Sequence, residues 1–176
     1  PITLIEGNDF YASPRLNPSG SRIAWITWNQ PNMPWDGTEL WIAEVAPNGN
    51  LSNSKLIAGG IQEAIGYPVW SPDGILYFIS DRNGWGNLYK TNENGKPECV
   101  HQVNEDLTEP EWVFGLSTYA FISPSEILAI LTKDGIRRLE KIDLDTGSSK
   151  AIEVPYTDIH YLRTTKDNVF FLGVPQ

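Results

Sequence analysis

The sequence predicts an all-β fold, and three observations carry that prediction. Short runs of β-branched and aromatic residues recur along the 176 residues, turn residues separate them, and one segment repeats imperfectly. No amphipathic helix longer than two turns is expected. The best helical candidate, residues 60–65, is short and bounded by glycine.

The expected strands are apolar along their whole length, which is typical of strands buried on both faces. The clearest are residues 23–28, 75–79, 127–131 and 169–172. Turn signals such as Pro72-Asp73-Gly74, Asn94-Gly95 and Asp134-Gly135 lie between strands.

A repeat gives these strands their order. Pro14–Gly20 matches Pro68–Gly74, 54 residues later, and each copy leads directly into a pair of strands. A third copy is expected to begin at Pro110-Glu111-Trp112, in the place of Pro68-Val69-Trp70, and a fourth near Ile159. A period of about 40–50 residues with four short strands per copy is typical of β-propeller blades.

The sequence therefore predicts a partial β-propeller of about four four-stranded antiparallel blades. They form one domain over residues 1–176, with approximate blade ranges 8–58, 59–104, 105–155 and an incomplete 156–176. One blade cannot cover both of its apolar faces, so stacked neighbours explain the doubly apolar strands. A β-sandwich is the alternative, but it gives no reason for a repeat.

Composition and charge exclude several classes of function. The net charge of −9 repels phosphate, so neither nucleic acid nor an anionic membrane is expected as a partner. The single cysteine, Cys99, leaves no internal disulfide and no multi-cysteine metal site. No apolar run approaches the roughly 20 residues of a membrane span and no signal peptide is visible, so a cytoplasmic location is expected. The ends at Pro1 and Gln176 are interpreted as internal boundaries of a longer protein.

A complete catalytic site is not expected. The nearest match to a Gly-x-Ser-x-Gly nucleophile elbow is Gly115-Leu116-Ser117-Thr118-Tyr119, which lacks the last glycine and leads into a strand. The two histidines are His101 and His160. Asp158 lies two residues before His160, on the same face of a strand, where the two are expected to be surface neighbours. We therefore expect no catalytic residue, no cofactor and no metal.

Two acidic segments resemble calcium ligands but fit structural roles better. Residues 105–111 carry four carboxylates and are expected to form a solvated loop between blades, with calcium binding as the alternative. Asp143-Leu144-Asp145-Thr146-Gly147 begins like an EF-hand loop. It lacks that loop's later glycine and glutamate, so it predicts a hairpin turn.

Further structural roles are expected in the second blade. In Asp81-Arg82-Asn83-Gly84, Asp81 and Arg82 would brace a tight turn and Gly84 would supply a positive φ. Trp70, Trp85 and Trp112 are expected to pack between blades rather than line a pocket.

The candidate contact site for a partner domain or substrate is the Pro- and Asn-rich insertion at residues 29–37, with Trp28, Trp35 and Asp36. Long inserted loops carry function more often than blade strands do.

Several segments resemble a known family. Trp70–Gly74, followed by Ile75–Tyr89, resembles the blade signature of prolyl-oligopeptidase-family serine peptidases and that of the periplasmic propeller of the Tol system. Glu111–Phe121 resembles the acylaminoacyl-peptidase or dipeptidyl-peptidase-like branch of the peptidases, and so does Leu16–Trp25 followed by Asn32–Trp41. The resemblance spans nearly the whole chain.

The resemblance implies that the chain is a non-catalytic part of a larger enzyme. In that family a propeller precedes an α/β-hydrolase domain, which holds a Ser-Asp-His triad, and the propeller screens peptides by size. The implied partners are a hydrolase domain of the same parent chain and peptides. The alternative is a non-enzymatic, Tol-like propeller that binds protein partners. Open blade faces at residues 23–28 and 169–172 also favour self-association.

Overall fold

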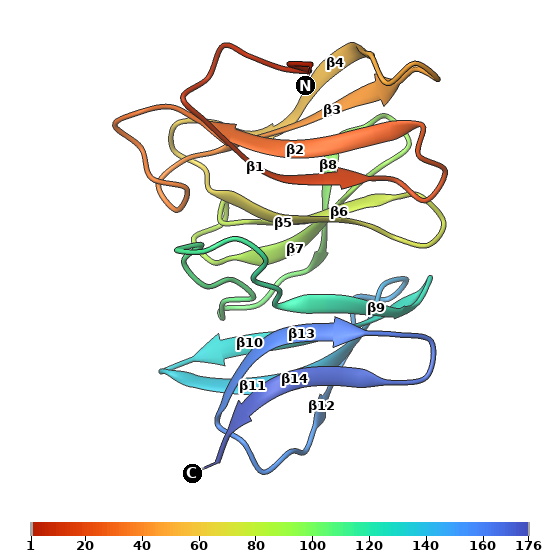
Figure 1. The fold of residues 1–176 in the computed structure, drawn as a ribbon. Coiled ribbons are helices and arrows are strands. Elements are labelled where there is room, and N and C mark those ends of the chain that lie inside the picture. The colour runs from red at the N-terminus through yellow and green to blue at the C-terminus, as the bar shows by residue number, and fades with distance from the viewer. Residues whose placement is uncertain (1, 176) are drawn as a thin grey trace.

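The chain folds as a stack of antiparallel sheets. The computed structural model describes residues 2–175, in which fourteen strands and no helix are found. Pro1 and Gln176, the expected internal boundaries, lie outside the described residues. The sheets follow one another from the N-terminal to the C-terminal end of the stack (Figure 1). This is the partial β-propeller that the repeat predicts.

Three sheets have four strands each and the last has two, always in sequence order. The first contains β1 (Phe10–Leu16), β2 (Arg22–Trp28), β3 (Glu39–Val45) and β4 (Leu51–Gly59). The second contains β5 (Ile65–Trp70), β6 (Leu76–Ser80), β7 (Asn87–Thr91) and β8 (Pro97–His101). The third contains β9 (Tyr119–Ser123), β10 (Glu126–Lys133), β11 (Ile136–Asp143) and β12 (Ser149–Ile152), and the last pairs β13 (Asp158–Thr164) with β14 (Val169–Val174).

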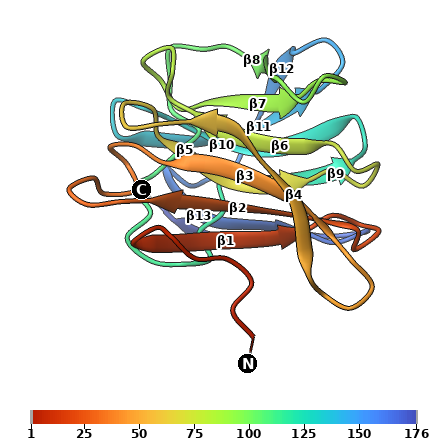
Figure 2. The same ribbon diagram turned by 90° about the horizontal axis from the view of Figure 1, so that it is seen from above.

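The first strand of each sheet lies on the inner edge of the stack. There β1 contacts β5 and β9 contacts β13, while β8 and β12 lie at the opposite edge from β1 (Figure 2). Because each sheet is an antiparallel meander, its tight turns after the first and third strands share one rim. The other rim receives the insertion after β2 and the long connections between sheets.

Apolar clusters fill the space between neighbouring sheets. In β6, Phe78 packs toward the first sheet, whereas its neighbours Tyr77 and Ile79 pack toward the third. In β10, Leu128 and Ile130 pack toward the β13–β14 hairpin, and the alternate residues pack toward the second sheet. The continuous apolar runs of the sequence are therefore explained by burial on both faces.

A bulge recurs on the inner strands of three sheets. Ser13, Tyr67 and Tyr161 have φ values of 51°, 55° and 57°, each within a register shift of its strand. Such values are uncommon for residues other than glycine, and bulges are features that a fold retains. Ser13 and Tyr67 precede Pro14 and Pro68, so these two copies of the repeat occupy equivalent places.

The predicted start of the third copy is wrong. Trp112 lies in the connection before β9, whereas Trp70 ends β5, so the two tryptophans are not equivalent. The turn at Ser123-Pro124 takes the place of the turn at Ser71-Pro72. The third inner strand, β9, has no tryptophan. The prediction failed because the connection before it contains Pro110-Glu111-Trp112, which matches the Pro-x-Trp pattern of the motif.

The N-terminal sheet does not present the bare face that its sequence predicts. Residues 24–27 are buried; Trp25 stacks on Trp41, with ring centroids 6.4 Å apart, and shares a cavity with Leu4 and Ile5 of the N-terminal segment. At the other end, β14 exposes most of its apolar side chains.

Residues 60–65, the best helical candidate, form no helix: residues 60–64 form a turn and Ile65 begins β5. Within residues 2–175 the structure also contains no helix of the length and apolarity that a membrane span requires.

Candidate functional site

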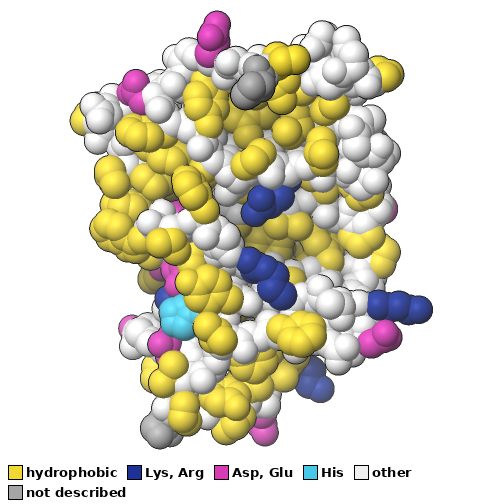
Figure 3. All heavy atoms as spheres, viewed as in Figure 1, with side chains coloured by type: hydrophobic (Ala, Val, Ile, Leu, Met, Phe, Trp, Pro, Cys, Tyr) yellow, Lys and Arg dark blue, Asp and Glu magenta, His cyan; other side chains and the backbone are white. Residues whose placement is uncertain are grey.

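The rim that carries the long loops bears a groove lined mainly by apolar side chains, with a volume of about 420 Å³. Two distant segments supply its walls, the insertion after β2 and the connection before β9. We call the following apolar residues the aromatic rim: Trp28, Met33, Pro34, Trp35, Trp112, Val113 and Phe114. The rings of Trp35 and Trp112 join the two segments, with centroids 4.3 Å apart. Hydrophobic side chains gather on this side of the molecule (Figure 3).

The aromatic rim is unusually exposed for apolar residues. Trp112 is 73% exposed and Phe114 is 80% exposed. Contiguous exposed apolar surface of this kind marks interaction sites on soluble proteins. The expectation that Trp112 packs between blades is therefore wrong, and Trp85 is also exposed, whereas Trp70 is buried between the first two sheets.

Of the predicted contact residues Trp28, Trp35 and Asp36, the two tryptophans lie in the groove and Asp36 lies outside it. Trp28 and Trp35 line the groove. Asp36 is exposed at the turn of the insertion, where its Oδ2 accepts a hydrogen bond of 2.8 Å from the amide of Met33. Sequence reasoning missed Trp112–Phe114. A signal was present, because these apolar residues lie between Pro110 and Gly115 without the alternation of a half-buried strand.

Glu111 lies where the groove meets two other cavities. It lines the groove, a second cavity of about 320 Å³ and a hollow of about 460 Å³ along the inner strands. Burial raises the pKa of Glu111 above its usual range, opposed by a hydrogen bond from the Tyr67 amide and by the charge of Arg15. This carboxyl group can accept a hydrogen bond from any of the three spaces.

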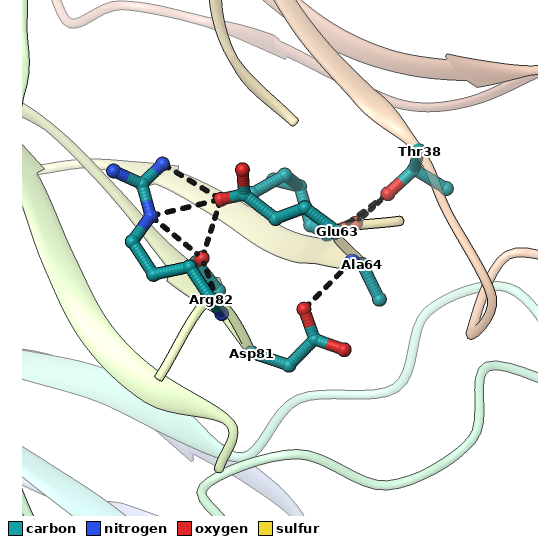
Figure 4. A network of polar contacts seen from close by, with 7 residues as sticks. Thr38, Glu63, Ala64, Asp81 and Arg82 are labelled. Atoms are coloured by element: carbon teal, nitrogen blue, oxygen red, sulfur yellow. Dashed lines mark hydrogen bonds and ion pairs between the residues drawn. The ribbon is translucent and has the colours of Figure 1, made fainter. Parts of the chain in front are cut away.

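The turn between β6 and β7 is held by a polar network (Figure 4). Nη2 and Nε of Arg82 donate to Oε1 of Glu63 over 2.6 Å and 2.9 Å. Oδ1 of Asp81 accepts from the Ala64 amide over 2.8 Å, and burial raises the pKa of Asp81. Gly84 has a φ of 91° and its amide donates to the Asp81 carbonyl. These contacts tie the turn to the connection before β5.

The acidic connection before β9 is not the solvated loop that its sequence predicts. Glu105 pairs with Arg138, and Glu109 pairs with Arg137 over 2.8 Å. The Glu109 side chain is only 11% exposed. These carboxylates are therefore occupied by arginines of β11. Within residues 2–175 no group of three or more His, Cys, Asp or Glu side chains is placed to hold a metal ion.

His160 belongs to the same ion-pair cluster. Its Nε2 lies 2.9 Å from Oδ1 of Asp158, and its Nδ1 lies 2.6 Å from Nη1 of Arg137. The hydroxyl of Ser117 donates to the carbonyl of Leu162 over 2.7 Å. Both ring nitrogens of His160 thus have partners, and the serine of the partial elbow motif bonds to backbone. This arrangement joins the last two sheets and supplies no activated nucleophile.

The remaining sequence candidates have structural positions. His101 is buried, with its Nδ1 2.8 Å from the carbonyl of Gly147 in the next sheet. Gly147 ends the turn between β11 and β12, which confirms the hairpin turn predicted from the EF-hand-like segment. There the amide of Thr146 donates to Oδ1 of Asp143 and lowers the pKa of that carboxyl.

Comparison with known proteins identifies relatives by structure. No protein-family model and no curated protein matches the chain. The crystal structure of puromycin hydrolase superimposes with a TM-score of 0.89 and 29% identity, over 96% of this chain and 26% of that one. A puromycin-hydrolyzing peptidase of Mycobacterium tuberculosis superimposes with a TM-score of 0.83 and 34% identity, over 90% of this chain and 24% of that one. The chain thus spans about a quarter of the length of these proteins.

A more distant structure shows the fold alone. TolB from Acinetobacter baumannii superimposes with a TM-score of 0.58 and 15% identity, over 95% of this chain and 40% of that one.

Proposed function

We propose a function from the premise that this chain is part of the β-propeller of a prolyl-oligopeptidase-family peptidase. In the parent protein the chain would gate the access of peptides and aminoacyl amides such as puromycin to a separate α/β-hydrolase domain. The observation that carries the proposal is the match to puromycin hydrolase over 96% of this chain. Hydrolysis itself would proceed by acyl transfer to a serine of the hydrolase domain.

We propose that the aromatic rim faces the hydrolase domain or the substrate on its way there. Three properties support this. The rim is exposed and apolar, it comes from the longest loops of the chain, and it adjoins the half-buried Glu111. Apolar anchors in a groove with a polar neighbour are typical of contact sites between domains and of ligand sites.

The test uses the full-length parent protein and its puromycin hydrolysis. Trp112→Ser and Phe114→Ser variants should lower kcat/KM about tenfold, because misplacement of the domains or of the substrate weakens transition-state positioning. Leu56→Ser is the matched control, since Leu56 is also exposed but lies on β4, outside the aromatic rim. Equal activity in all of these variants would rule out a role for the aromatic rim.

The alternative, a non-enzymatic Tol-like propeller, makes a different prediction about the parent gene. A hydrolase domain with a Gly-x-Ser-x-Gly elbow downstream of this segment supports the peptidase. Further blades followed by a stop codon would support the binding module and contradict the proposal.

We expect this chain by itself to hydrolyse neither acyl-amino-acid nor dipeptidyl chromogenic substrates. The reason is that the Ser117 hydroxyl donates to backbone carbonyls and hydrogen-bonds to no histidine or carboxylate among residues 2–175. The measurement is a chromogenic assay on repurified chain. Turnover that persists through repurification and disappears in Ser117→Ala would contradict this expectation.

We also propose that the isolated chain self-associates through the β13–β14 hairpin. Phe170, Leu172 and Val174 are each more than half exposed, and the hairpin has two unpaired edges. Light scattering after gel filtration should give a mass above that of the monomer, and Leu172→Asp should restore the monomer. A monomeric mass for the unmodified chain at low and high salt would disprove association.

A further inference from the structure

The hollow along the inner strands has an unusual charge for so acidic a chain. It has a volume of about 460 Å³, within the size range of small-molecule and short-peptide sites. Its basic residues are Arg15 of β1 and Arg163 of β13, and its one acidic residue is Glu111. The net charge of the whole chain is −9, whereas the charged residues that line this cavity are mainly basic. Basic side chains lie near the centre of the corresponding face (Figure 3).

Neither arginine forms an ion pair within 4.0 Å of a carboxylate in the described part of the chain, although the charge of Arg15 acts on Glu111 over a longer distance. The arginines Arg82, Arg137 and Arg138 each form an ion pair with a glutamate. For Arg15 and Arg163, by contrast, no carboxylate oxygen among residues 2–175 lies within 4.0 Å of the guanidinium group. A guanidinium group has five N–H donors in a fork that matches a carboxylate.

Both side chains are anchored in ways that leave donors free. Nη1 of Arg15 donates to the Pro14 carbonyl over 3.1 Å. Nη1 of Arg163 donates to the Leu162 carbonyl over 2.9 Å, and its Nη2 donates to the carbonyl of Gly115. Neutral carbonyls orient the arginines without cancelling their charge, so the attraction for an anion is retained.

The backbone beneath the two arginines is also fixed. The indole of Trp70 donates to the carbonyl of Arg15 over 2.9 Å. The hydroxyl of Ser117 donates to the carbonyl of Leu162, directly before Arg163. Two cationic groups are thus held on rigid inner strands rather than on loops, which lowers the entropy lost when a ligand binds.

The hollow also offers apolar surface between the two charges. Val69 of β5, Leu116 of the connection before β9 and Phe121 of β9 line it together with the arginines. A ligand that suits this lining has an anionic group beside an apolar one. Glu111 does not cancel the site, because its Oε1 accepts a hydrogen bond from the Tyr67 amide and one carboxyl opposes two guanidinium groups.

We propose that this hollow is a carboxylate-binding site that holds the C-terminal carboxylate of a short peptide between Arg15 and Arg163, with the last apolar side chain against Val69, Leu116 and Phe121. The ligand class rests on the proposed peptidase function, whereas the carboxylate chemistry rests on the hollow alone.

The test is an NMR titration of the ¹⁵N-labelled chain at low ionic strength with N-acetyl-Gly-Gly-Phe. The amides of Gly115, Ser117 and Arg163 should shift and saturate. The peptide with an amidated C-terminus should bind about tenfold more weakly, because a charge-assisted pair is lost. An amidated N-acetyl-Gly-Glu-Phe separates a side-chain carboxylate from a C-terminal one, and equal binding of this peptide would overturn the C-terminal assignment.

Substitutions complete the test. Arg15→Gln and Arg163→Gln should each raise Kd for the free-acid peptide about tenfold, and Arg163→Lys should recover part of the loss. Arg22→Gln is the matched control, because Arg22 also forms no ion pair within the described residues but stacks on Trp70, outside the hollow. Circular dichroism shows whether each variant keeps its β-structure.

Three further results would overturn the proposal: equal affinity for acid and amide, unchanged affinity in both glutamine variants, or displacement of the peptide by inorganic phosphate at equal concentration. The last result would show that the apolar lining contributes nothing. Because the titration involves no hydrolysis, its failure leaves the proposed peptidase function intact, and the absence of a hydrolase domain would leave the titration valid.

Discussion

Arg137→Ala should lower the free energy of unfolding by about 3–5 kcal/mol, because it breaks a largely buried ion pair and leaves the Glu109 carboxylate without its partner. The Arg137 side chain is 17% exposed, and its Nη2 lies 2.8 Å from Oε2 of Glu109. The same guanidinium donates to the Ile159 carbonyl and contacts His160, so one side chain joins β11, the acidic connection and β13. The other oxygen of Glu109 has no hydrogen-bond partner among the described residues.

Urea denaturation followed by circular dichroism measures this loss. Lys90→Ala is the control: Lys90 pairs with the exposed Glu98 over 3.7 Å, and such surface pairs contribute about 0–1 kcal/mol. The double variant Arg137→Met with Glu109→Gln should recover part of the loss, since it removes both charges together. A loss below about 1 kcal/mol for Arg137→Ala would show that the pair of Arg137 and Glu109 is more exposed to solvent than the structure describes.

This ion-pair cluster shows where sequence reasoning reaches its limit. The composition of the acidic connection predicted a solvated loop, because the local sequence does not reveal which arginines lie opposite its carboxylates. Arg137 and Arg138 are about 30 residues from Glu105 and Glu109 along the chain, and only the stacking of sheets brings them together. Pairings of this kind depend on tertiary contacts and not on any local pattern.

The blade architecture could be predicted because it depends on local signals that repeat. Strand pairs, turns and doubly apolar runs are properties of short segments. The predicted alignment of the repeat was wrong in the third sheet, where the inner strand β9 lacks the tryptophan that β5 contains. The strands that follow were still expected in the correct order, because their turn signals did not depend on that tryptophan.

The candidate site was predicted only in part, for the same physical reason. The insertion after β2 was visible as an interruption of the repeat, so Trp28 and Trp35 could be singled out. Trp112 and Phe114 belong to a connection about 80 residues further along the chain, and their place in one groove with Trp35 follows from the stacking of the first sheets. Arg15 and Arg163 share a cavity for a similar reason, since they come from the first and the last inner strands.

Phe78→Ala should destabilise the chain by about 3–5 kcal/mol, through lost burial and the cavity that remains. Phe78 is 0% exposed on β6, within the cluster between the first and second sheets. Its ring stacks near Tyr89, with centroids 6.0 Å apart. The surrounding backbone belongs to two hydrogen-bonded sheets, so it cannot collapse far to fill the space. Thermal and urea unfolding both measure the change.

Phe114→Ala provides the comparison that separates core from contact surface. Phe114 is equally large and apolar but mostly exposed, so its removal should change the free energy of unfolding by no more than about 0.5 kcal/mol. A large loss for Phe114→Ala would mean that the aromatic rim serves the stability of this chain. If the free energy of unfolding falls little for Phe114→Ala and much for Phe78→Ala, the folding of this chain does not require the apolar residues of the aromatic rim. Contact with a partner or substrate would then account for them.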